Sequence, residues 1–394
     1  MNAINSNRIT SIDFLRGSIM VIMALDHVRD YLYSGSFYFD PLDLSKTSGI
    51  LFFTRWITHF CMPIFMLLAG TSAYLVGQKK PKPELSAFLI KRGLWLIFLE
   101  MIIINLGWNF NITFPMFFFI TIWALGVAMI VLAGIIHLQP KLILAICLII
   151  VFSHNLLDNI HINGNTLPAF GWAMLHAQQV FFWHGETFLV GYPLIPLIAV
   201  MPLGYCLGQW YAKGYEVAKR QKKLLTVGAA SLGLFILLRY SNLYGDPSKW
   251  SVQNDAFFTF LSFLNVSKYP PSLLYLLLTL GSACIFLSVT EQLKGRLANI
   301  ISVYGRVPMF YYLVHIYVIH IIATVASALI QGQDWHIWFL TKPIWFTRNL
   351  KGYGFSLPVA YLIWAGIVVG LYPLCKWYDT YKQANKQKWW LSYL

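Results

Sequence analysis

The chain has 394 residues, of which 58% are hydrophobic and 11% charged, and it carries a formal net charge of +14 with a mean hydropathy of +0.61. Soluble domains have roughly 25% charged residues. So few charged side chains cannot cover a surface that faces water on all sides, which excludes a soluble enzyme, a disordered chain and a nucleic-acid-binding protein. Because the apolar residues form long unbroken runs, the composition predicts an integral membrane protein with helical spans.

Ten stretches of the sequence are apolar over most of the roughly 20 residues that a helix needs to cross a bilayer. We expect spans at 12–33, 49–77, 86–107, 115–136, 140–157, 187–211, 224–240, 272–292, 304–330 and 356–378. An even number of spans places both ends of the chain on one side of the membrane. The sequence therefore predicts an all-α, polytopic membrane fold of about ten transmembrane helices, which forms a single domain over residues 1–394.

Basic residues gather in the loops on one side of this arrangement. Most of the 29 Lys and Arg residues fall there, whereas more than half of the 15 acidic residues fall on the other side. The positive-inside rule assigns the basic side to the cytoplasm. We therefore expect both termini in the cytoplasm, and we interpret the positive net charge as a sign of topology and of contact with anionic lipid headgroups.

The first predicted span contains ionisable residues, which are costly inside a bilayer and by default indicate a functional site. Arg16 and His27 are eleven positions apart, so they lie on one helix face about 16 Å apart along the axis. Asp26 adjoins His27, and Asp30 lies one turn beyond it; either carboxylate is expected to polarise the imidazole. His27 is the candidate catalytic residue. Arg16 is either a donor-binding residue or a membrane anchor that reaches toward the cytoplasmic surface.

The second predicted span carries Arg55 and His59 on one stripe, followed by Pro63. At the expected depth His59 can form a two-histidine site with His27; the alternative is that Arg55 and His59 only bond to the first helix. His315, in the ninth predicted span, is a further candidate for binding the substrate. No spacing of the HExxH type is present, and the five cysteines lie within or beside apolar runs, so we expect no metal site.

The longest segments between the spans are predicted to face away from the cytoplasm and are rich in tryptophan and histidine. One of them contains Trp183, His184 and Glu186. Tryptophan near the membrane surface is first of all part of an interfacial aromatic belt. The alternative is a platform that binds a sugar, because an aromatic ring next to a histidine and a carboxylate supplies both stacking and hydrogen bonds.

Several motifs, taken in order, resemble the heparan-alpha-glucosaminide N-acetyltransferase catalytic-domain family of bacterial membrane proteins, over residues from about 8 to 325. The matching motifs are Arg8–Gly17, Ala24–Asp30, Phe60–Gly70, Tyr192–Pro196 with Gly204, Tyr205 and Gly208, Lys268–Ser272, and Gly305–Pro308 with Tyr311, His315 and His320. An arginine and a histidine separated by ten residues, as Arg16 and His27 are, also resemble the signature of the acyltransferase-3 family. In that family the histidine is catalytic, which the resemblance carries over to His27.

The resemblance implies a transmembrane acyltransferase in a bacterial inner membrane, with acetyl-CoA as the cytosolic donor and an extracytoplasmic sugar or glycan as the acceptor. The enzyme that gives the family its name is thought to use a histidine in the loop between its first two helices. Residues 31–51 here contain no histidine. The acceptor group can therefore be an amine or a hydroxyl.

A mechanism follows if the donor enters from the cytoplasm. Lys91, Arg92 and Arg306, together with Arg16, are expected to bind the phosphates of CoA, so that the pantetheine arm reaches His27. His27 then acts as a base or carries the acetyl group itself. His59 or Arg55 is the candidate group that stabilises the oxyanion.

An alternative interpretation is a proton-coupled transporter of a small polar solute, because buried histidines and acids are equally expected there. Transporters commonly show two related halves with broken helices. Here the unusual residues are concentrated in the first two predicted helices, which favours the acyltransferase. The sequence leaves a homo-oligomer possible.

Overall fold

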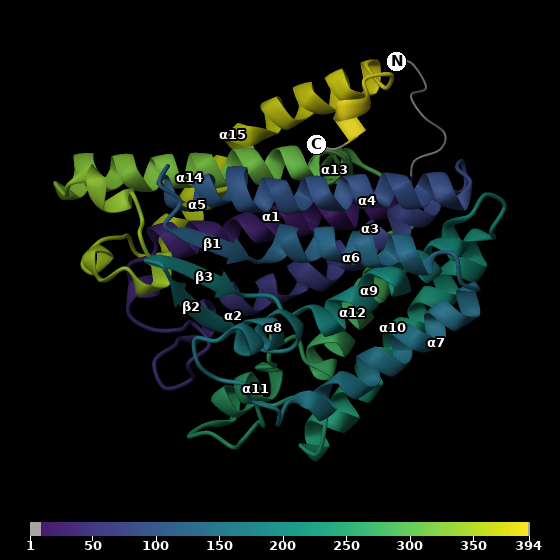
Figure 1. Cartoon of the computed structure of the whole chain (residues 1–394), viewed down its shortest axis with the longest axis horizontal. Helices are drawn as coiled ribbons and strands as arrows, with labels where there is room; N and C mark the ends of the chain where they lie inside the picture. Colours follow the sequence, from purple (N-terminus) through teal and green to yellow (C-terminus); the bar gives the residue numbers. More distant parts are fainter. Residues whose placement is uncertain (1–8, 393–394) are drawn as a thin grey trace.

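The computed structural model describes residues 9–392, so Arg8, the first residue of the family motifs, lies outside the described part (Figure 1). Within that part the chain is mostly helical, as the sequence predicts. Six helical segments are long and apolar enough to cross a membrane: Gly49–Gly77, Pro140–Leu157, Leu194–Tyr211, Val217–Ser241, Pro308–Gln331 and Leu357–Ala384. This agrees with an integral membrane protein, whereas the expected number of ten spans and the cytoplasmic termini stay predictions.

The elements follow the order of the predicted spans, and some spans are built from two consecutive helices. The helices are α1 (Thr10–Leu32), α2 (Gly49–Trp56), α3 (Cys61–Gly77), α4 (Lys82–Phe98), α5 (Asn105–Asn109), α6 (Thr121–Ile135), α7 (Pro140–Ser153), α8 (Leu167–Leu175), α9 (Leu194–Gly208), α10 (Val217–Ser241), α11 (Ala256–Leu264), α12 (Leu273–Val289), α13 (Arg296–Arg306), α14 (Pro308–Gln331) and α15 (Leu357–Ala384). The strands are β1 (Met116–Phe119), β2 (Gln179–Trp183) and β3 (Glu186–Val190).

The expectation of an all-α chain is wrong in one respect, because β1, β3 and β2 form a three-stranded sheet in that order. β3 pairs in parallel with β1 and antiparallel with β2. Both β1 and β3 lie at the start of stretches that were predicted as whole spans, 115–136 and 187–211. A short apolar run rich in phenylalanine fits a buried strand as well as a helix, and hydropathy alone does not separate the two.

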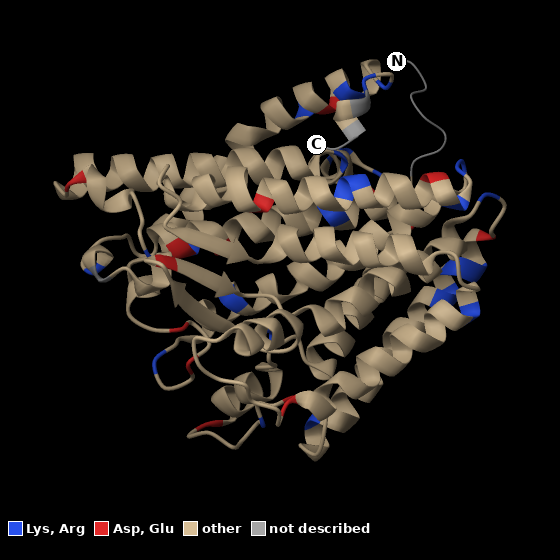
Figure 2. Cartoon of the chain, viewed as in Figure 1, with Lys and Arg blue, Asp and Glu red and all other residues tan. Residues whose placement is uncertain are grey.

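The long helices run side by side along the long axis of the molecule, and the sheet, α8, α11 and the long loops gather toward its left end (Figure 1). Basic residues cluster at the right end, near the start of α4 and the start of α10, whereas acidic residues are more numerous toward the left end (Figure 2). Under the positive-inside rule the right end is the one predicted to face the cytoplasm, and this orientation stays a prediction.

Two pairs of helices cross at points where glycines face each other. On α3 and α9, a Cβ added to Gly70 would lie within 3.0 Å of the carbonyl oxygen of Met201, and one added to Gly204 would equally clash with Leu67. Gly17 of α1 meets the backbone of α13 in the same way. Small residues at such crossings let helix backbones approach closely in a membrane. These contacts fix the position of α1 and α3, which carry much of the site described below.

A buried acid explains how α6 begins inside the protein. Glu100 lies in a π-helical turn that follows α4, and its Oε2 accepts hydrogen bonds from the backbone N–H groups of Ile122 (2.7 Å) and Trp123 (3.1 Å). A carboxylate at a helix N-terminus satisfies the first N–H groups and interacts favourably with the helix dipole. Glu100 therefore has a structural role at the start of α6.

Candidate active site

A cavity of about 660 Å³ lies at the end of the molecule where the sheet and the long loops gather. Its walls include parts of α1, α2, α3, α5 and α14, the strands β2 and β3, the loop at 36–41 and the segment at 268–269. Four residues that the sequence singled out line it together: Asp26, His27, Asp30 and Arg55. The structure therefore brings the polar residues of the first two predicted spans to one site.

The charged residues in this cavity form a chain of ion pairs between α1 and α2. Asp26 contacts Arg29 through Oδ1 (2.9 Å) and Arg55 through Oδ2 (2.5 Å). Arg29 also contacts the carboxylate of Asp30 at 2.5 Å. Arg29 and Asp30 are buried, and buried charges are stable only when they are paired. Two acids are thus paired with two arginines, which holds the C-terminal end of α1 against α2.

His27 is joined to His315 of α14 by a hydrogen bond of 2.8 Å between Nδ1 of His27 and Nε2 of His315. Nδ1 of His315 lies 2.9 Å from the carbonyl oxygen of Tyr311. A carbonyl oxygen only accepts, so Nδ1 of neutral His315 carries the proton and its Nε2 accepts from Nδ1 of His27. Nδ1 of neutral His27 therefore carries the proton, and its Nε2 is unprotonated and can act as a base. His27 lines the cavity.

The predicted partner of His27 is therefore replaced by another residue. The sequence predicted that Asp26 or Asp30 polarises the imidazole, but their carboxylates face Arg29 and Arg55. His315, expected to bind substrate, takes the orienting position. Sequence spacing on one helix could not show this, because His27 and His315 are 288 positions apart.

His59 does not complete the expected two-histidine site with His27. Its side chain is fully buried, and neither ring nitrogen has a hydrogen-bond partner among the described residues. The ring packs against Tyr275 with a centroid distance of 5.7 Å, and the Tyr275 hydroxyl donates to the carbonyl oxygen of His59 at 2.7 Å. Its neighbours Thr58 and Cys61 line the cavity, whereas His59 is not among the lining residues.

Arg16 lies deeper in the bundle and connects three helices. Its guanidinium donates to the carbonyl oxygen of Gly305 (3.0 Å) and to the hydroxyl of Ser72 (2.9 Å), and it also contacts Asp13 (3.4 Å). These contacts tie α1 to α3 and α13. They give Arg16 a structural role in addition to the predicted role in binding the donor.

The other predicted donor-binding residues lie away from the cavity walls. Lys91 is exposed on α4, and Arg92 beside it is half-buried. Arg306, at the end of α13, donates through Nε to a carboxylate oxygen of Asp379 at 2.7 Å. A role for these three in binding CoA stays a prediction.

The predicted sugar platform lies at the turn between β2 and β3. Trp183 ends β2 and packs edge-on against Phe170 with a centroid distance of 5.2 Å, while His184 adopts a left-handed conformation with φ 53° and Glu186 begins β3. The cavity is lined instead by the other end of the hairpin, through Gln179, Val180 and Leu189. The structure thus separates these three residues from His27 by the length of the strands.

The sequence missed several residues that line the cavity. The ring of His27 lies edge-on to Trp108 (4.9 Å) and Tyr312 (6.1 Å). Lys268 and Tyr269 come from the segment before α12, and Lys268 is 7% exposed. One feature of the sequence could have indicated Lys268: it is a lysine in a loop predicted to face away from the cytoplasm, where basic residues are few. Among residues 9–392, no group of three or more His, Cys, Asp or Glu side chains is placed to hold a metal ion.

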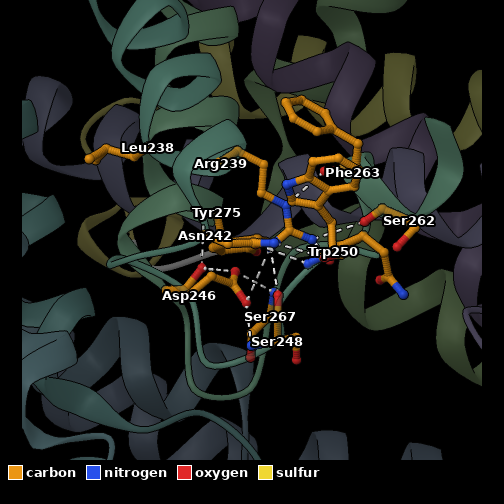
Figure 3. A network of polar contacts seen from close by, with 12 residues as sticks. Leu238, Arg239, Asn242, Asp246, Ser248, Trp250, Ser262, Phe263, Ser267 and Tyr275 are labelled. Atoms are coloured by element: carbon orange, nitrogen blue, oxygen red, sulfur yellow. Dashed lines mark hydrogen bonds and ion pairs between the residues drawn. The ribbon is translucent and has the colours of Figure 1, made fainter. Parts of the chain in front are cut away.

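The segment that carries Lys268 is fixed by a buried arginine (Figure 3). Arg239, near the end of α10, donates to the backbone carbonyl oxygens of Phe263 (2.9 Å), Ser248 (2.6 Å), Ser262 (2.9 Å) and Asn265 (2.7 Å). One side chain thereby holds the loop at 241–255 and the end of α11. Buried carbonyl groups need such partners, because leaving them unpaired costs about 1–3 kcal/mol each.

Asp246 extends this network to Ser267, the residue before Lys268 (Figure 3). Its Oδ2 accepts from the backbone N–H of Ser267 (2.9 Å) and from the hydroxyl of Ser272 (2.7 Å), which are the residues on either side of the 268–271 turn. Burial raises the pKa of the Asp246 carboxyl, and its hydrogen bonds and the nearby Arg239 oppose that shift. The position of Lys268 is therefore set by groups outside the cavity.

Replacing Arg239 by methionine is expected to destabilise the protein by about 3 kcal/mol, because it removes the partner of four backbone carbonyl oxygens. Thermal unfolding of the purified protein in detergent measures the effect. Arg296→Met is the matched control, because Arg296 is exposed at the start of α13. Equal melting temperatures for the two variants would show that the network does not stabilise the loop.

Comparison with known protein families gives a match over residues 8–240 to heparan-alpha-glucosaminide N-acetyltransferase, catalytic domain. The matched part extends to the last turn of α10 and includes Asp26, His27 and Arg55, whereas Lys268 and His315 lie beyond it. No curated protein sequence matches the chain. The match covers more than half of the 394 residues, and the chain therefore belongs to the heparan-alpha-glucosaminide N-acetyltransferase catalytic-domain family.

Proposed function

We propose that the protein transfers an acetyl group from acetyl-CoA to a hydroxyl or amino group of an extracytoplasmic sugar, with His27 as the catalytic residue. Family membership gives the general class, a membrane acetyltransferase, and favours it over a proton-coupled transporter. The observation that carries the residue assignment is the bond between His27 and His315 at the wall of a charged cavity. It presents a neutral imidazole with one defined basic nitrogen.

This arrangement supplies the proton transfers of acyl transfer. The acceptor group gives its proton to Nε2 of His27 while its oxygen or nitrogen attacks the thioester carbon. When the tetrahedral intermediate collapses, the C–S bond breaks and the sulfur of CoA takes the proton from His27. Nδ1 of His27 keeps its bond to His315 throughout, so the ring holds its orientation. The same nitrogen can instead attack the thioester and carry the acetyl group, in two successive transfers.

Arg55 is the proposed donor to the oxyanion that develops in this reaction. It lines the cavity with His27, and its Nη1 bonds Asp26, which fixes the direction of the guanidinium. Arginine has five N–H donors, so the bond to Asp26 leaves others for a ligand. A cation held by a carboxylate is already oriented before the substrate binds, which is how enzymes stabilise developing charge.

We further propose that the donor enters from the side of the basic loops, where Lys91, Arg92 and Arg306 bind its phosphates, and that the protein lies in a bacterial inner membrane. Arg306 already pairs with Asp379, so donor binding there replaces or shares an existing ion pair. The charge separation along the bundle supports this direction of entry (Figure 2).

Release of free CoA thiol from acetyl-CoA by the purified full chain in nanodiscs tests this proposal. The acceptor panel contains sugars with free hydroxyl groups, amino sugars and glycans, and mass spectrometry of the products distinguishes N- from O-acetylation. We expect thiol release that depends on the acceptor. Absence of acetyl-CoA turnover with every acceptor would overturn the assignment of the donor.

Replacing His315 by alanine is expected to lower kcat about 100-fold, because His27 then loses the group that orients its ring and fixes its proton. His315→Gln is expected to recover part of the rate, since its side-chain oxygen can accept from Nδ1 of His27. Thiol release gives kcat and KM for each variant. If the two variants have the same kcat, the role of His315 as an acceptor for His27 is wrong.

A further inference from the structure

The cavity is lined by a buried cation that neither the proposed acetyl transfer nor an ion pair among the described residues uses. Lys268 lines the cavity and is 7% exposed, and among the described residues no carboxylate forms an ion pair with it. An ammonium group removed from water is costly unless an opposite charge or several acceptors compensate it. A buried lysine that faces a cavity without such a partner is a candidate for binding an anion.

The nearby acids are already paired with other cations. Asp26 contacts both Arg29 and Arg55, and Asp30 contacts Arg29. Asp40 also lines the cavity, but it is exposed at the rim, where its Oδ1 accepts from the backbone N–H of Leu42 at 2.9 Å. The inner part of the cavity therefore has three cations and two anions, and the additional positive charge is that of Lys268.

Two tyrosines extend this surface. The hydroxyl of Tyr269 lies 3.4 Å from that of Tyr192, and both residues line the cavity. Burial alone would raise the pKa of Tyr269, but Lys268 and then Arg55 outweigh it, so the pKa is lowered. The Nζ atom of Lys268 lies 5.4 Å from the centre of the Tyr269 ring, so this ammonium group and the tyrosine are adjacent on the cavity wall.

Hydrogen bonds hold the backbone of the turn that carries Lys268. Ser267 and Ser272 are both held by Asp246, and the N–H of Ser272 also donates to the carbonyl oxygen of Ser267 at 3.1 Å. Lys268 and Pro271 form an isolated bridge across the turn. A backbone that is already held leaves less of the chain to order when a ligand binds, which favours a binding site over a lysine on an unrestrained surface loop.

We propose that Lys268 binds an anionic group on the acceptor sugar, a carboxylate or a phosphate, while another group of that sugar faces His27. This inference rests on the proposed acetyl transfer for the presence of an acceptor in the cavity. The volume of about 660 Å³ lies within the roughly 300–1,000 Å³ of small-molecule sites. Lys268 thereby selects acidic or phosphorylated sugars over neutral ones.

Calorimetry on the full chain in nanodiscs, without acetyl-CoA, tests this selection with glucose, glucuronate and glucose 6-phosphate as probes. We expect one or both anionic sugars to bind at least tenfold more tightly than glucose. A preference for glucuronate identifies a carboxylate ligand, and a preference for glucose 6-phosphate identifies a phosphate ligand. Adenosine 3′,5′-bisphosphate serves as the probe for the phosphates of the donor.

Substitutions assign the preference to Lys268. Lys268→Gln is expected to remove the difference between charged and neutral sugars, and Lys268→Arg is expected to keep it. Lys249→Gln is the matched control, because Lys249 is exposed in the loop at 241–255 and lies outside the cavity lining. Size-exclusion chromatography checks the folding of each variant. If Lys268→Gln does not fold, equal affinities for charged and neutral sugars on the unmodified protein still overturn the inference.

Several results would overturn the inference. Equal affinities for glucose and both anionic sugars, or no binding of any sugar, would contradict an anion site. A preference that survives in Lys268→Gln would contradict the role of Lys268. Displacement of the anionic sugar by adenosine 3′,5′-bisphosphate would assign the site to the donor. These results can be distinguished from a failure of the proposed function. Charge-selective binding without acetyl transfer would contradict the proposed reaction but not the anion site. Transfer to neutral sugars alone would contradict only the role of Lys268.

Discussion

Replacing His27 by alanine is expected to lower acetyl transfer by about 10²–10⁴-fold, the usual contribution of a general acid–base group, or to abolish it if His27 carries the acetyl group. The physical reason is that Nε2 of His27 is the nitrogen that the His315 bond leaves unprotonated at the cavity wall. The rate of CoA thiol release, measured with the acceptor that the panel identifies, gives the size of the loss.

The fold is expected to tolerate this change, because the His27 ring is partly exposed to the cavity and its backbone stays in α1. Size-exclusion chromatography and the melting temperature check this point. His161→Ala is the matched control, since His161 is exposed in the loop before α8. A folded His27→Ala protein that retains full turnover would remove His27 from the mechanism.

Replacing Gly70 or Gly204 by alanine is expected to destabilise the protein by about 3 kcal/mol. The added Cβ at either position would clash with a backbone carbonyl group of the facing helix, and a backbone cannot move aside as a flexible side chain can. The expected result is a lower melting temperature in detergent and a smaller yield of folded protein. The two helices concerned, α3 and α9, cross at this point.

Gly233→Ala is the control for the effect of the substitution itself. Gly233 lies within α10, is exposed, and has no atom within 4 Å of the position of an added Cβ. Alanine there is expected to leave the melting temperature unchanged or slightly higher, because it favours the helix more than glycine does. If Gly70→Ala melts at the same temperature as Gly233→Ala, the close crossing of α3 and α9 is not needed for stability.

Most of the helical architecture could be predicted from the sequence, because long apolar runs have few alternatives to helices in a membrane. The exceptions are local. Met116–Phe119 and Glu186–Val190 form strands at the start of two predicted spans, since pairing between β1 and β3 supplies the hydrogen bonds that a helix would otherwise supply. Such pairing joins residues about 70 positions apart, and the periodicity of one segment carries no information about it.

The candidate site was predicted in part. Asp26, His27, Asp30 and Arg55 were singled out because ionisable residues are rare in a span, and the structure places all four in one cavity. Their partners could not be assigned in the same way. His27 bonds His315 across the bundle, and Arg55 reaches Asp26, so the pairing depends on how helices pack rather than on spacing within one helix.

The burial of Lys268 could not be predicted from the sequence either. It lies in a loop, where a lysine usually points into water, and its burial depends on Arg239 and Asp246, which fold that loop over the cavity. A sequence shows which residues are charged, whereas their burial in a loop depends on tertiary contacts.

The most direct test of the account is transfer of acetyl groups across a sealed membrane. The protein is reconstituted in proteoliposomes with acetyl-CoA inside and a membrane-impermeant acceptor sugar outside, and acetylated sugar outside is measured over time. Molecules inserted with their basic loops inward carry out the reaction, and liposomes with His27→Ala protein or without protein serve as controls.

The account predicts acetylated sugar outside the liposomes that requires His27, while acetyl-CoA itself stays inside. Product that forms only when acetyl-CoA and acceptor share one side would contradict transfer across the membrane. Product formed equally by the His27→Ala protein would contradict the site.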